Sequence, residues 1–292
     1  MITKNIRIIF SILLLALSIA YLVLNQTKKP KVSVLMLTYE RANILSSAID
    51  SILNQTYKDF ELIILNDGST DNTDEIIKPY LKKDKRIRYY QNSSNKGIPY
   101  SRNKALKLAR GKYITFMDDD DYSYPTKLEK QVAFIKSSPH TDVVIGQIEN
   151  TNTIPQTHDE IVSHLISYNN IGNVNIMFKN DFIKKHNIKF DETFVVAEDW
   201  DFWLQMMFKG AKFASIPDVV IKRNWDSKRH YKASSFEINN PKIRERIGLF
   251  FSPTDSEGFY KASPCRKIFM LKRKNIISTQ FYQNIKTNNN CP

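Results

Sequence analysis

Cysteine and glycine are scarce in this chain of 292 residues, and each shortage removes a class of site. The two cysteines, Cys265 and Cys291, both lie near the C-terminus, so the sequence offers neither a disulfide framework nor a CxxC metal site. The eight glycines form neither the phosphate-binding pattern GxxxxGK followed by Ser or Thr nor the dinucleotide-binding pattern GxGxxG. P-loop phosphoryl transfer and nicotinamide chemistry therefore lose their main sequence support.

Charge and composition narrow the class of protein. With 42% hydrophobic and 12% aromatic residues, the chain can bury one full-sized core, and disorder along its whole length is excluded. Acidic residues (30) are outnumbered by basic ones (43), and the net charge of +13 favours an anionic partner such as nucleic acid, an anionic membrane face or a sugar nucleotide. No recognised RNA- or DNA-binding motif is present, so we expect no nucleic-acid partner.

A long hydrophobic run lies near the N-terminus. Residues 8–24 carry no charge, and as a helix they span roughly 26 Å, which the uncharged flank to Thr27 extends toward the ~30 Å of a bilayer core. Leu22, Leu24 and Gln26 are too large for a signal-peptide cleavage site. The run therefore predicts an uncleaved signal anchor and a single-pass membrane protein. Basic residues flank it on both sides, so its orientation stays undetermined.

From residue 31 onward, strand-like and helix-like segments alternate with short connections. The expected strands are 32–38, 60–65, 86–90 and 113–117, and the expected helices are 42–55, 72–83 and 99–109. A further amphipathic helix, 200–208, is expected to bury its aromatic residues and methionines. Such alternation predicts an α/β fold with a mainly parallel central sheet that helices cover on both faces.

Polar residues follow the expected strands. Thr38 and Glu40 come after the first strand, Asp67 after the second, and Asp118 and Asp120 after the fourth. Open parallel sheets bind ligands beyond the carboxyl ends of their strands, so we expect these residues to share one site. Within this site, the Asp67 carboxylate could accept a hydrogen bond from an N–H group of a nucleobase.

Four consecutive carboxylates, Asp118–Asp121, end the expected strand 113–117. Like charges this close repel one another unless a cation lies among them. Oxygen ligands suit Mg²⁺ or Mn²⁺, which usually complete their shells with water and the phosphates of a nucleotide. The acidic run therefore predicts a site for a metal-bound diphosphate.

Six short segments occur in a recognisable order along the chain. They are VLMLTY (34–39), SILNQTY (51–57), NDGSTD (66–71), SRNK (101–104), FMDDDD (116–121) and AEDWD (197–201). Together they resemble a family 2 glycosyltransferase over about residues 31 to 225. The resemblance implies a GT-A fold that binds a nucleotide-sugar donor and a Mn²⁺ or Mg²⁺ ion. It also implies a reaction that inverts the configuration at the anomeric carbon.

The resemblance also implies roles for single residues. The residues expected to contact the nucleotide sugar are Thr38, Tyr39, Glu40, Asp67, Arg102, Asp118 and Asp119. The expected metal ligands are Asp118 and Asp120, and the expected catalytic base is Asp199. One carboxylate suffices to take the proton of an attacking hydroxyl in a single inverting displacement. Retention by double displacement would need a second carboxylate; Glu198 or Asp201 could be proposed for it, but the resemblance gives them no such role.

Simpler explanations exist for each motif alone. The acidic run could be a helix N-terminus, or a calcium loop with Asp118, Asp120 and Glu129 at positions 1, 3 and 12, although Ser123 stands where that loop needs glycine. Asp199 could only cap the helix 200–208. Likewise, Arg102 could be an ordinary surface cation, and Asp67 could be a turn-forming residue.

Two positions depart from the family pattern, and the resemblance fades after residue 227. In the segment Arg223-Asn224-Trp225, tryptophan stands where relatives often have a histidine near the metal, and His230 follows five residues later. At position 40, glutamate stands where relatives often have asparagine. After residue 258 the chain has seven basic residues and no acidic one, which suits either contact with anionic lipid headgroups or a solvated tail. We expect an anchor and linker over 1–30, a GT-A domain over 31–230 and a basic tail over 231–292.

The sequence as a whole predicts a membrane-anchored inverting glycosyltransferase. It would move a sugar from a nucleotide donor, a UDP-sugar being favoured, to a hydroxyl of a glycan, lipid or protein. One alternative is a polyprenyl-phosphate sugar synthase, whose phosphate acceptor needs little base catalysis. Another is a non-catalytic scaffold that binds nucleotide sugars. A sugar nucleotidyltransferase has less support, because no GxGTR-like loop opens the first strand.

Overall fold

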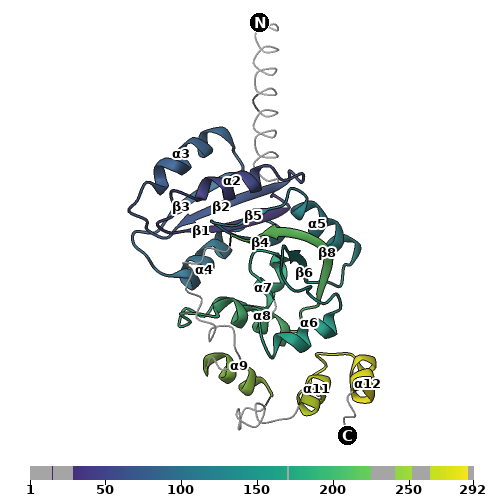
Figure 1. Cartoon of the computed structure of the whole chain (residues 1–292). Helices are drawn as coiled ribbons and strands as arrows, with labels where there is room; N and C mark the ends of the chain where they lie inside the picture. The colour runs from purple at the N-terminus through teal and green to yellow at the C-terminus, as the bar shows by residue number, and fades with distance from the viewer. Residues whose placement is uncertain (1–14, 16–28, 170, 225–240, 252–263, 289–292) are drawn as a thin grey trace, which may run out of the picture.

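The computed structural model describes residue 15 and residues 29–169, 171–224, 241–251 and 264–288 (Figure 1). The first half of the chain alternates β1 (Val32–Thr38), α2 (Leu45–Leu53), β2 (Phe60–Asn66), α3 (Thr73–Lys83), β3 (Ile87–Gln91), α4 (Ile98–Leu108) and β4 (Tyr113–Asp118). It continues with β5 (Tyr122–Ser123), α5 (Lys127–Ser137), β6 (Val143–Ile148), α6 (His158–Leu165), β7 (Ile176–Lys179), α7 (Asn180–His186), α8 (Glu198–Phe208) and β8 (Phe213–Lys222). Three further helices are α9 (Pro241–Phe251), α11 (Pro264–Arg273) and α12 (Thr279–Asn288).

The described strands form one eight-stranded sheet in the order β3-β2-β1-β4-β7-β6-β8-β5. Pairing is parallel between β1 and both β2 and β4, between β2 and β3, and between β6 and β8. Pairing is antiparallel where β7 meets β4 and β6, and where β5 meets β8. The prediction of a mainly parallel sheet therefore holds for the half that contains β1 to β4, whereas the complete sheet is mixed.

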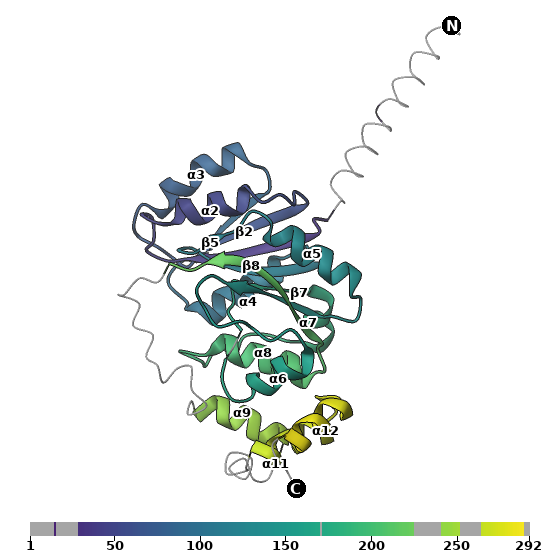
Figure 2. The same ribbon diagram turned by 45° about the vertical axis from the view of Figure 1, so that its right-hand side comes forward.

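Helices cover both faces of this sheet (Figures 1 and 2). Because side chains alternate along a strand, Val34 and Met36 of β1 pack with α2, α3 and α5 on one face, and Leu35 packs with α4, α6 and α8 on the other. Every residue of β2 is buried, as expected for a parallel strand covered on both sides. Two hydrophobic clusters, one on each face, fix the sheet and leave its strand ends free for polar residues.

The alternation expected between residues 32 and 118 is confirmed. β1 has the predicted bounds, and α4 begins and ends one residue before the predicted helix 99–109. The helix predicted over 42–55 is shorter, because Arg41 and the residues after it form a turn in which the Ile44 and Leu45 amides donate to the Arg41 carbonyl. The aromatic residues and methionines of α8 are buried, as predicted.

The predicted anchor lies almost wholly outside the described residues, and the predicted tail is described in part. Within the described part of the chain, no helix is both long and apolar enough to cross a bilayer. The predicted anchor, residues 8–24, is outside that part except for Leu15 and stays a prediction, and Trp225 and His230 are outside it as well. The described helices of the predicted tail pack on the domain, because side chains of α9 and α11 join the hydrophobic cluster around α8.

Candidate active site

The carboxyl ends of β1, β2 and β4 meet at one edge of the sheet, beside a cavity of about 770 Å³. Parallel pairing sets Thr38 opposite Asn66 and Leu37 opposite Asp118, so the residues that follow these strands are neighbours. The Asp67 amide donates to the Thr38 carbonyl (2.9 Å) and ties the first two strand ends together. The topology thereby brings residues that are far apart in sequence to one space.

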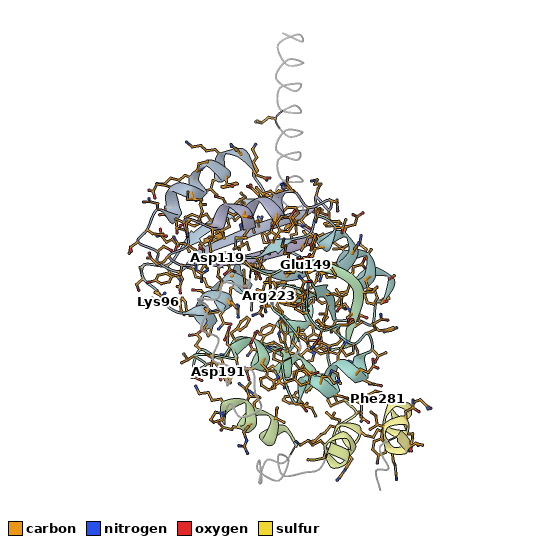
Figure 3. The ribbon with its side chains drawn as sticks, viewed as in Figure 1. Lys96, Asp119, Glu149, Asp191, Arg223 and Phe281 are labelled. Atoms are coloured by element: carbon orange, nitrogen blue, oxygen red, sulfur yellow. The ribbon has the colours of Figure 1, made fainter. Side chains whose placement is uncertain are left out.

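Seven of the nine residues predicted for the site line this cavity. They are Thr38, Tyr39, Asp67, Arg102, Asp118, Asp119 and Asp199. Lys96 and Arg223, labelled with Asp119 in Figure 3, line it from two other segments of the chain. Glu40 and Asp120 are not among the lining residues. The Glu40 carboxylate accepts hydrogen bonds from the Thr70 amide (2.7 Å) and hydroxyl (3.0 Å), so it joins two loops instead of facing the cavity.

Asp67 is a buried carboxylate that organises the loop before α4. Its Oδ1 accepts hydrogen bonds from the Asn92 side-chain amide (2.7 Å), the Lys96 backbone amide (3.0 Å) and the Ser101 hydroxyl (2.8 Å). Its Oδ2 accepts one from the Gly97 amide (2.9 Å). Oδ1 accepts three hydrogen bonds and Oδ2 accepts one, so Oδ2 is the oxygen of this carboxylate that has room for a further donor. An N–H group of a ligand in the cavity suits that position.

Gly68 allows the chain after β2 to approach this loop. Its φ of +80° is a conformation that residues with a side chain rarely adopt, and a Cβ here would lie 2.5 Å from the Ser94 carbonyl carbon. The glycine therefore holds two walls of the cavity close together. It shapes the site without contributing a functional group.

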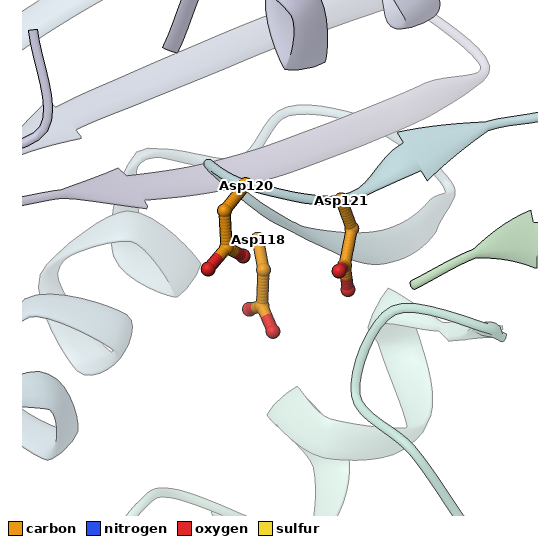
Figure 4. Close-up of side chains that lie close together, drawn as sticks. All are labelled: Asp118, Asp120 and Asp121. Carbon is orange, nitrogen blue, oxygen red and sulfur yellow. The ribbon is translucent and has the colours of Figure 1, made fainter. Parts of the chain in front are cut away.

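Three carboxylates lie together at the end of β4, on Asp118, Asp120 and Asp121 (Figure 4). One oxygen from each lies within 4.8 Å of the others. Carboxylates in this arrangement suit Mg²⁺ or Mn²⁺, so the residues present fit the expected ion. Asp118 and Asp120 are the metal ligands predicted from the sequence, and in the structure Asp121 joins them.

Two arginines offset the negative charge of this cluster. Arg41 Nη1 lies 3.0 Å from Asp120 Oδ2, and Arg223 Nε lies 3.8 Å from Asp121 Oδ2. Burial, together with the neighbouring Asp118 charge, raises the pKa of Asp121 to about 6 in spite of Arg223. Burying several carboxylates side by side costs free energy that a bound cation would lower.

Asp199 belongs to the stretch of residues 192–199 that lines the cavity before and at the start of α8. Its Oδ1 accepts a hydrogen bond from the Trp200 amide (2.7 Å), and its Oδ2 accepts one from the Asn173 side-chain amide (3.2 Å). Desolvation by the packed surroundings, followed by the Glu198 charge, raises the pKa of Asp199 to about 6, although Arg102 opposes the rise. A carboxylate with this pKa can accept a proton near neutral pH.

Arg102 and Glu198 form an ion pair between α4 and α8, with 2.7 Å from Arg102 Nη1 to Glu198 Oε1. The guanidinium also lies over the rings of Phe116 (5.7 Å) and Phe190 (5.2 Å). Only 9% and 13% of the two charged side chains are exposed, so neither can lose its partner without leaving a buried charge. Arg102 is therefore fixed beside Asp199, and its contact with a donor stays a prediction.

No individual site role is predicted from the sequence for Arg41, Asp121, Asn173 or Arg223. Two of them have a signal in the sequence, since Asp121 ends the acidic run and Arg223 begins the segment that departs from the family pattern. Asn173 has none, because it lies in an irregular connection before β7 and reaches Asp199 only through the fold.

Comparison with known proteins gives a match of more than half the chain to one family. Residues 33–195 match the family described as Glycosyl transferase family 2. The matched part contains Asp67, Arg102 and the whole carboxylate cluster, and Asp199 lies four residues beyond it.

Two curated relatives and one solved structure illustrate the likeness. An uncharacterized glycosyltransferase of Methanocaldococcus jannaschii is 35% identical over 215 residues, which cover 70% of this chain and 73% of that relative. The Escherichia coli protein named UDP-Glc:alpha-D-GlcNAc-diphosphoundecaprenol beta-1,3-glucosyltransferase WfaP is 33% identical over 190 residues, 62% of this chain and 72% of its own. The crystal structure of S. aureus TarS 1-349 in complex with UDP-GlcNAc superposes with a TM-score of 0.63 and 23% identity, over 82% of this chain and 70% of TarS. That structural likeness shows a shared GT-A-type fold.

Proposed function

This chain belongs to glycosyl transferase family 2, and from that membership we propose an inverting, metal-dependent enzyme that moves a sugar from a UDP-sugar to a hydroxyl of a lipid-linked carbohydrate. The observation that supports it most directly is the single cavity lined by Asp67, Asp118 and Asp199. Donor recognition, stabilisation of the leaving diphosphate and proton removal need groups that face one space.

A uridine nucleotide suits the part of the cavity around Asp67. In a uridine nucleotide the uracil ring keeps one N–H, at N3, and Asp67 Oδ2 has room to accept a hydrogen bond from it. Tyr39 lines the same cavity with 44% of its surface exposed, so its ring is available to stack on a base. The name of the Escherichia coli relative includes UDP-Glc, and the solved TarS structure contains UDP-GlcNAc. Both support the choice of a UDP-sugar.

The metal ion would be held by Asp118, Asp120 and Asp121. When bound, Mn²⁺ or Mg²⁺ would neutralise charge on the departing diphosphate. The chain also brings its own cations to the cavity, since Lys96 and Arg223 line it. These side chains would orient the diphosphate and add positive charge where the leaving group develops negative charge.

Asp199 would act as the general base. Above pH ~6 its carboxylate is ionised and can take the proton of the acceptor hydroxyl as that oxygen attacks the sugar. The hydrogen bonds from Asn173 and the Trp200 amide hold both carboxylate oxygens in place, so the base is oriented before the acceptor arrives.

Inversion is favoured because the neighbouring carboxylates are engaged. Retention by double displacement needs a second carboxylate that attacks the sugar. Glu198 is paired with Arg102, and Asp201 is fully buried with one oxygen 2.5 Å from Arg246 Nε. Neither can act as a nucleophile without breaking its ion pair. A single displacement assisted by Asp199 is the simpler chemistry.

The cavity mouth suits an acceptor with a hydrocarbon part. Ile98, Val195 and Val196 line the cavity with 51%, 93% and 47% of their surfaces exposed. Exposed apolar side chains that lie together beside a polar site are suited to contact an apolar group. The acceptor in the name of the Escherichia coli relative is GlcNAc-diphosphoundecaprenol, which combines a sugar hydroxyl with such a group.

A donor screen tests the proposal. The detergent-solubilised full chain is incubated with UDP-Glc, UDP-GlcNAc, UDP-Gal or GDP-Man, with Mn²⁺ or with EDTA, and with a short-chain GlcNAc-diphospholipid as acceptor probe. We expect Mn²⁺-dependent release of UDP from one UDP-sugar and a product whose anomeric configuration, read by NMR, is opposite to that of the donor.

The alternatives give different results in the same screen. Transfer to a polyprenyl phosphate in place of the GlcNAc-diphospholipid would favour a polyprenyl-phosphate sugar synthase. Binding of UDP-sugars with no release of UDP under any condition would favour a non-catalytic scaffold. Retention of configuration would contradict the role given to Asp199.

We also propose that residues 8–24 anchor the chain in a membrane as a single span. The support is their length and lack of charge. Flotation of the full chain with liposomes, compared with a chain that starts at residue 29, tests this. Equal flotation of the two chains would contradict it.

A further inference from the structure

Helix α9, which lies within the predicted basic tail, contacts the segment that precedes the proposed base. We call residues 191–197 the wall segment, because five of its seven residues line the cavity directly before Glu198 and Asp199. α9 lies beside α8 in both views of the fold (Figures 1 and 2). Ile243 and Ile247 of α9 are fully buried in the cluster that contains α8.

Arg246 on α9 binds the wall segment and α8 at the same time. Its Nε lies 2.5 Å from Asp201 Oδ1, and its Nη2 lies 3.2 Å from Asp191 Oδ2. Asp201 is fully buried, stands two residues after Asp199 and receives a second hydrogen bond from Gln205 (2.6 Å). One guanidinium therefore fixes the first turn of the helix that carries the base and the first residue of the wall segment.

Lys242 adds a contact in the middle of the wall segment. Its Nζ donates a hydrogen bond to the Thr193 carbonyl and lies 5.3 Å from the centre of the Phe194 ring. Phe194 is buried, whereas Val195 beside it is 93% exposed. Residues 195–197 therefore have little packing of their own. Their position depends on the contacts that hold residues 191–194 in place.

Helix α4 holds the chain just before and within the wall segment from another direction. The Asn103 side chain accepts a hydrogen bond from the Phe190 amide (2.9 Å) and donates to the Phe190 carbonyl (2.9 Å) and to Glu192 Oε1 (3.0 Å). The wall segment is thus attached both to α4, which follows the proposed donor loop, and to α9. The α9 attachment comes from a region that the family match does not reach.

We propose that Arg246 is a positioning residue that, through Asp191 and Asp201, sets the place of the wall segment and thereby the acceptor side of the cavity. The inference rests on the proposed function in that the acceptor must reach Asp199. α9 is then a working part of the active site, although it lies more than 40 residues beyond the base in the sequence. Donor binding, which involves the strand ends and the loop before α4, does not depend on this contact.

The experiment compares Arg246→Gln, Arg246→Lys and Asp191→Asn with Lys209→Gln in the full chain. Lys209 is an exposed cation at the other end of α8, so its variant removes the same charge without touching the wall segment. Asp191→Asn keeps an oxygen that can accept from Thr193, as Asp191 Oδ1 does now, and removes the charge that attracts Arg246 and, more weakly, Lys242. The measurements are hydrogen exchange of residues 191–198, the Kd for UDP with Mn²⁺, and kcat and KM for the GlcNAc-diphospholipid probe.

We expect Arg246→Gln to raise hydrogen exchange in residues 191–198 and to raise the KM for the acceptor probe at least fivefold, with the UDP Kd changed less than twofold. Asp191→Asn gives the same changes to a smaller extent, Arg246→Lys lies between Arg246→Gln and the wild type, and Lys209→Gln matches the wild type. A proportional loss of UDP affinity in Arg246→Gln and Asp191→Asn, or unchanged exchange and acceptor KM in both, would overturn the inference.

Failure of the proposed function would be recognised separately. If the wild-type chain transfers no sugar to the probe, the function is wrong, and hydrogen exchange and UDP affinity still decide whether Arg246 positions the wall segment. Near-ultraviolet circular dichroism identifies a variant that does not fold. Asp191→Asn, at a side chain that is 33% exposed, then carries the test.

Discussion

Arg102 and Glu198 hold each other at 2.7 Å next to Asp199, and their opposite charges act on its carboxyl group in opposite directions. Glu198 raises the pKa of Asp199, and Arg102 lowers it. The ion pair thus has two effects at once. It joins α4 to α8, and it sets the pH at which the proposed base becomes ionised.

Substitution of either partner should move the acid limb of the pH profile, in opposite directions. Arg102→Gln leaves the Glu198 charge unopposed, so the pKa of Asp199 rises and kcat/KM falls at a higher pH than in the wild type. Glu198→Gln leaves Arg102 unopposed, and the limb moves to lower pH. Profiles of kcat/KM between pH 5 and 9 measure both. Shifts of the same sign would show that the two charges do not control the base.

The raised pKa of Asp199 also predicts a pH-dependent stability difference. Its pKa rises from 3.8 to about 6 on folding, so the folded chain binds more protons between these values and loses stability as the pH rises through this range. Asp199→Asn removes that cost. The variant should be more stable than the wild type at pH 8 by at most about 3 kcal/mol, and by less at pH 5. Urea unfolding at the two pH values measures the difference, and an equal difference at both would contradict the raised pKa.

The carboxylate cluster should bind Mn²⁺ through its own side chains. Asp118→Asn and Asp120→Asn should each weaken Mn²⁺ binding by at least tenfold, measured by electron paramagnetic resonance or calorimetry without donor. Glu129→Gln is the control, because Glu129 accepts a hydrogen bond from the Thr56 hydroxyl (2.7 Å) and is not in the cluster. Loss of Mn²⁺ binding in Glu129→Gln would instead favour the calcium-loop interpretation. Chelation by EDTA should also lower turnover.

Gly68→Ala should weaken donor binding through a steric clash. A Cβ at this position would lie 2.5 Å from Ser94, so segment 92–97 must move away from Asp67. Gly210→Ala is the matched control, because Gly210 has a similar φ of +85° with no atom within 4 Å of the added Cβ. Both variants should lose about 1 kcal/mol of stability from backbone strain. Gly68→Ala alone should raise the UDP Kd about tenfold or more, and equal Kd values for the two would contradict this account.

The first half of the fold could be predicted because β1, β2 and β4 are short, mostly apolar runs bounded by turn residues. β1, for example, has the predicted bounds, since its seven residues are buried or nearly so between two helical layers. The second half could not be predicted in the same way. β5 has two residues, and β7 runs against both of its neighbours, which no local pattern in the sequence indicates.

The residues of the site also divide into those that could be predicted from the sequence and those that could not. Asp67 and Asp118 could be placed together because parallel strands end at one edge of the sheet. Asp199 could be placed with them only through the family resemblance. The contact of Asn173 with Asp199 spans 26 residues, and that of Arg246 with Asp201 spans 45. Such pairs depend on how helices and connections pack, so single-sequence periodicity does not reveal them.

In the proposed mechanism Asp199 removes a proton from the acceptor while other residues bind the donor. The single-turnover transfer rate of Asp199→Asn, with its UDP Kd determined in the same preparation, separates these two roles. We expect a rate lower by about 10²- to 10⁴-fold and a UDP Kd within twofold of the wild-type value. A transfer rate equal to that of the wild type would contradict this mechanism.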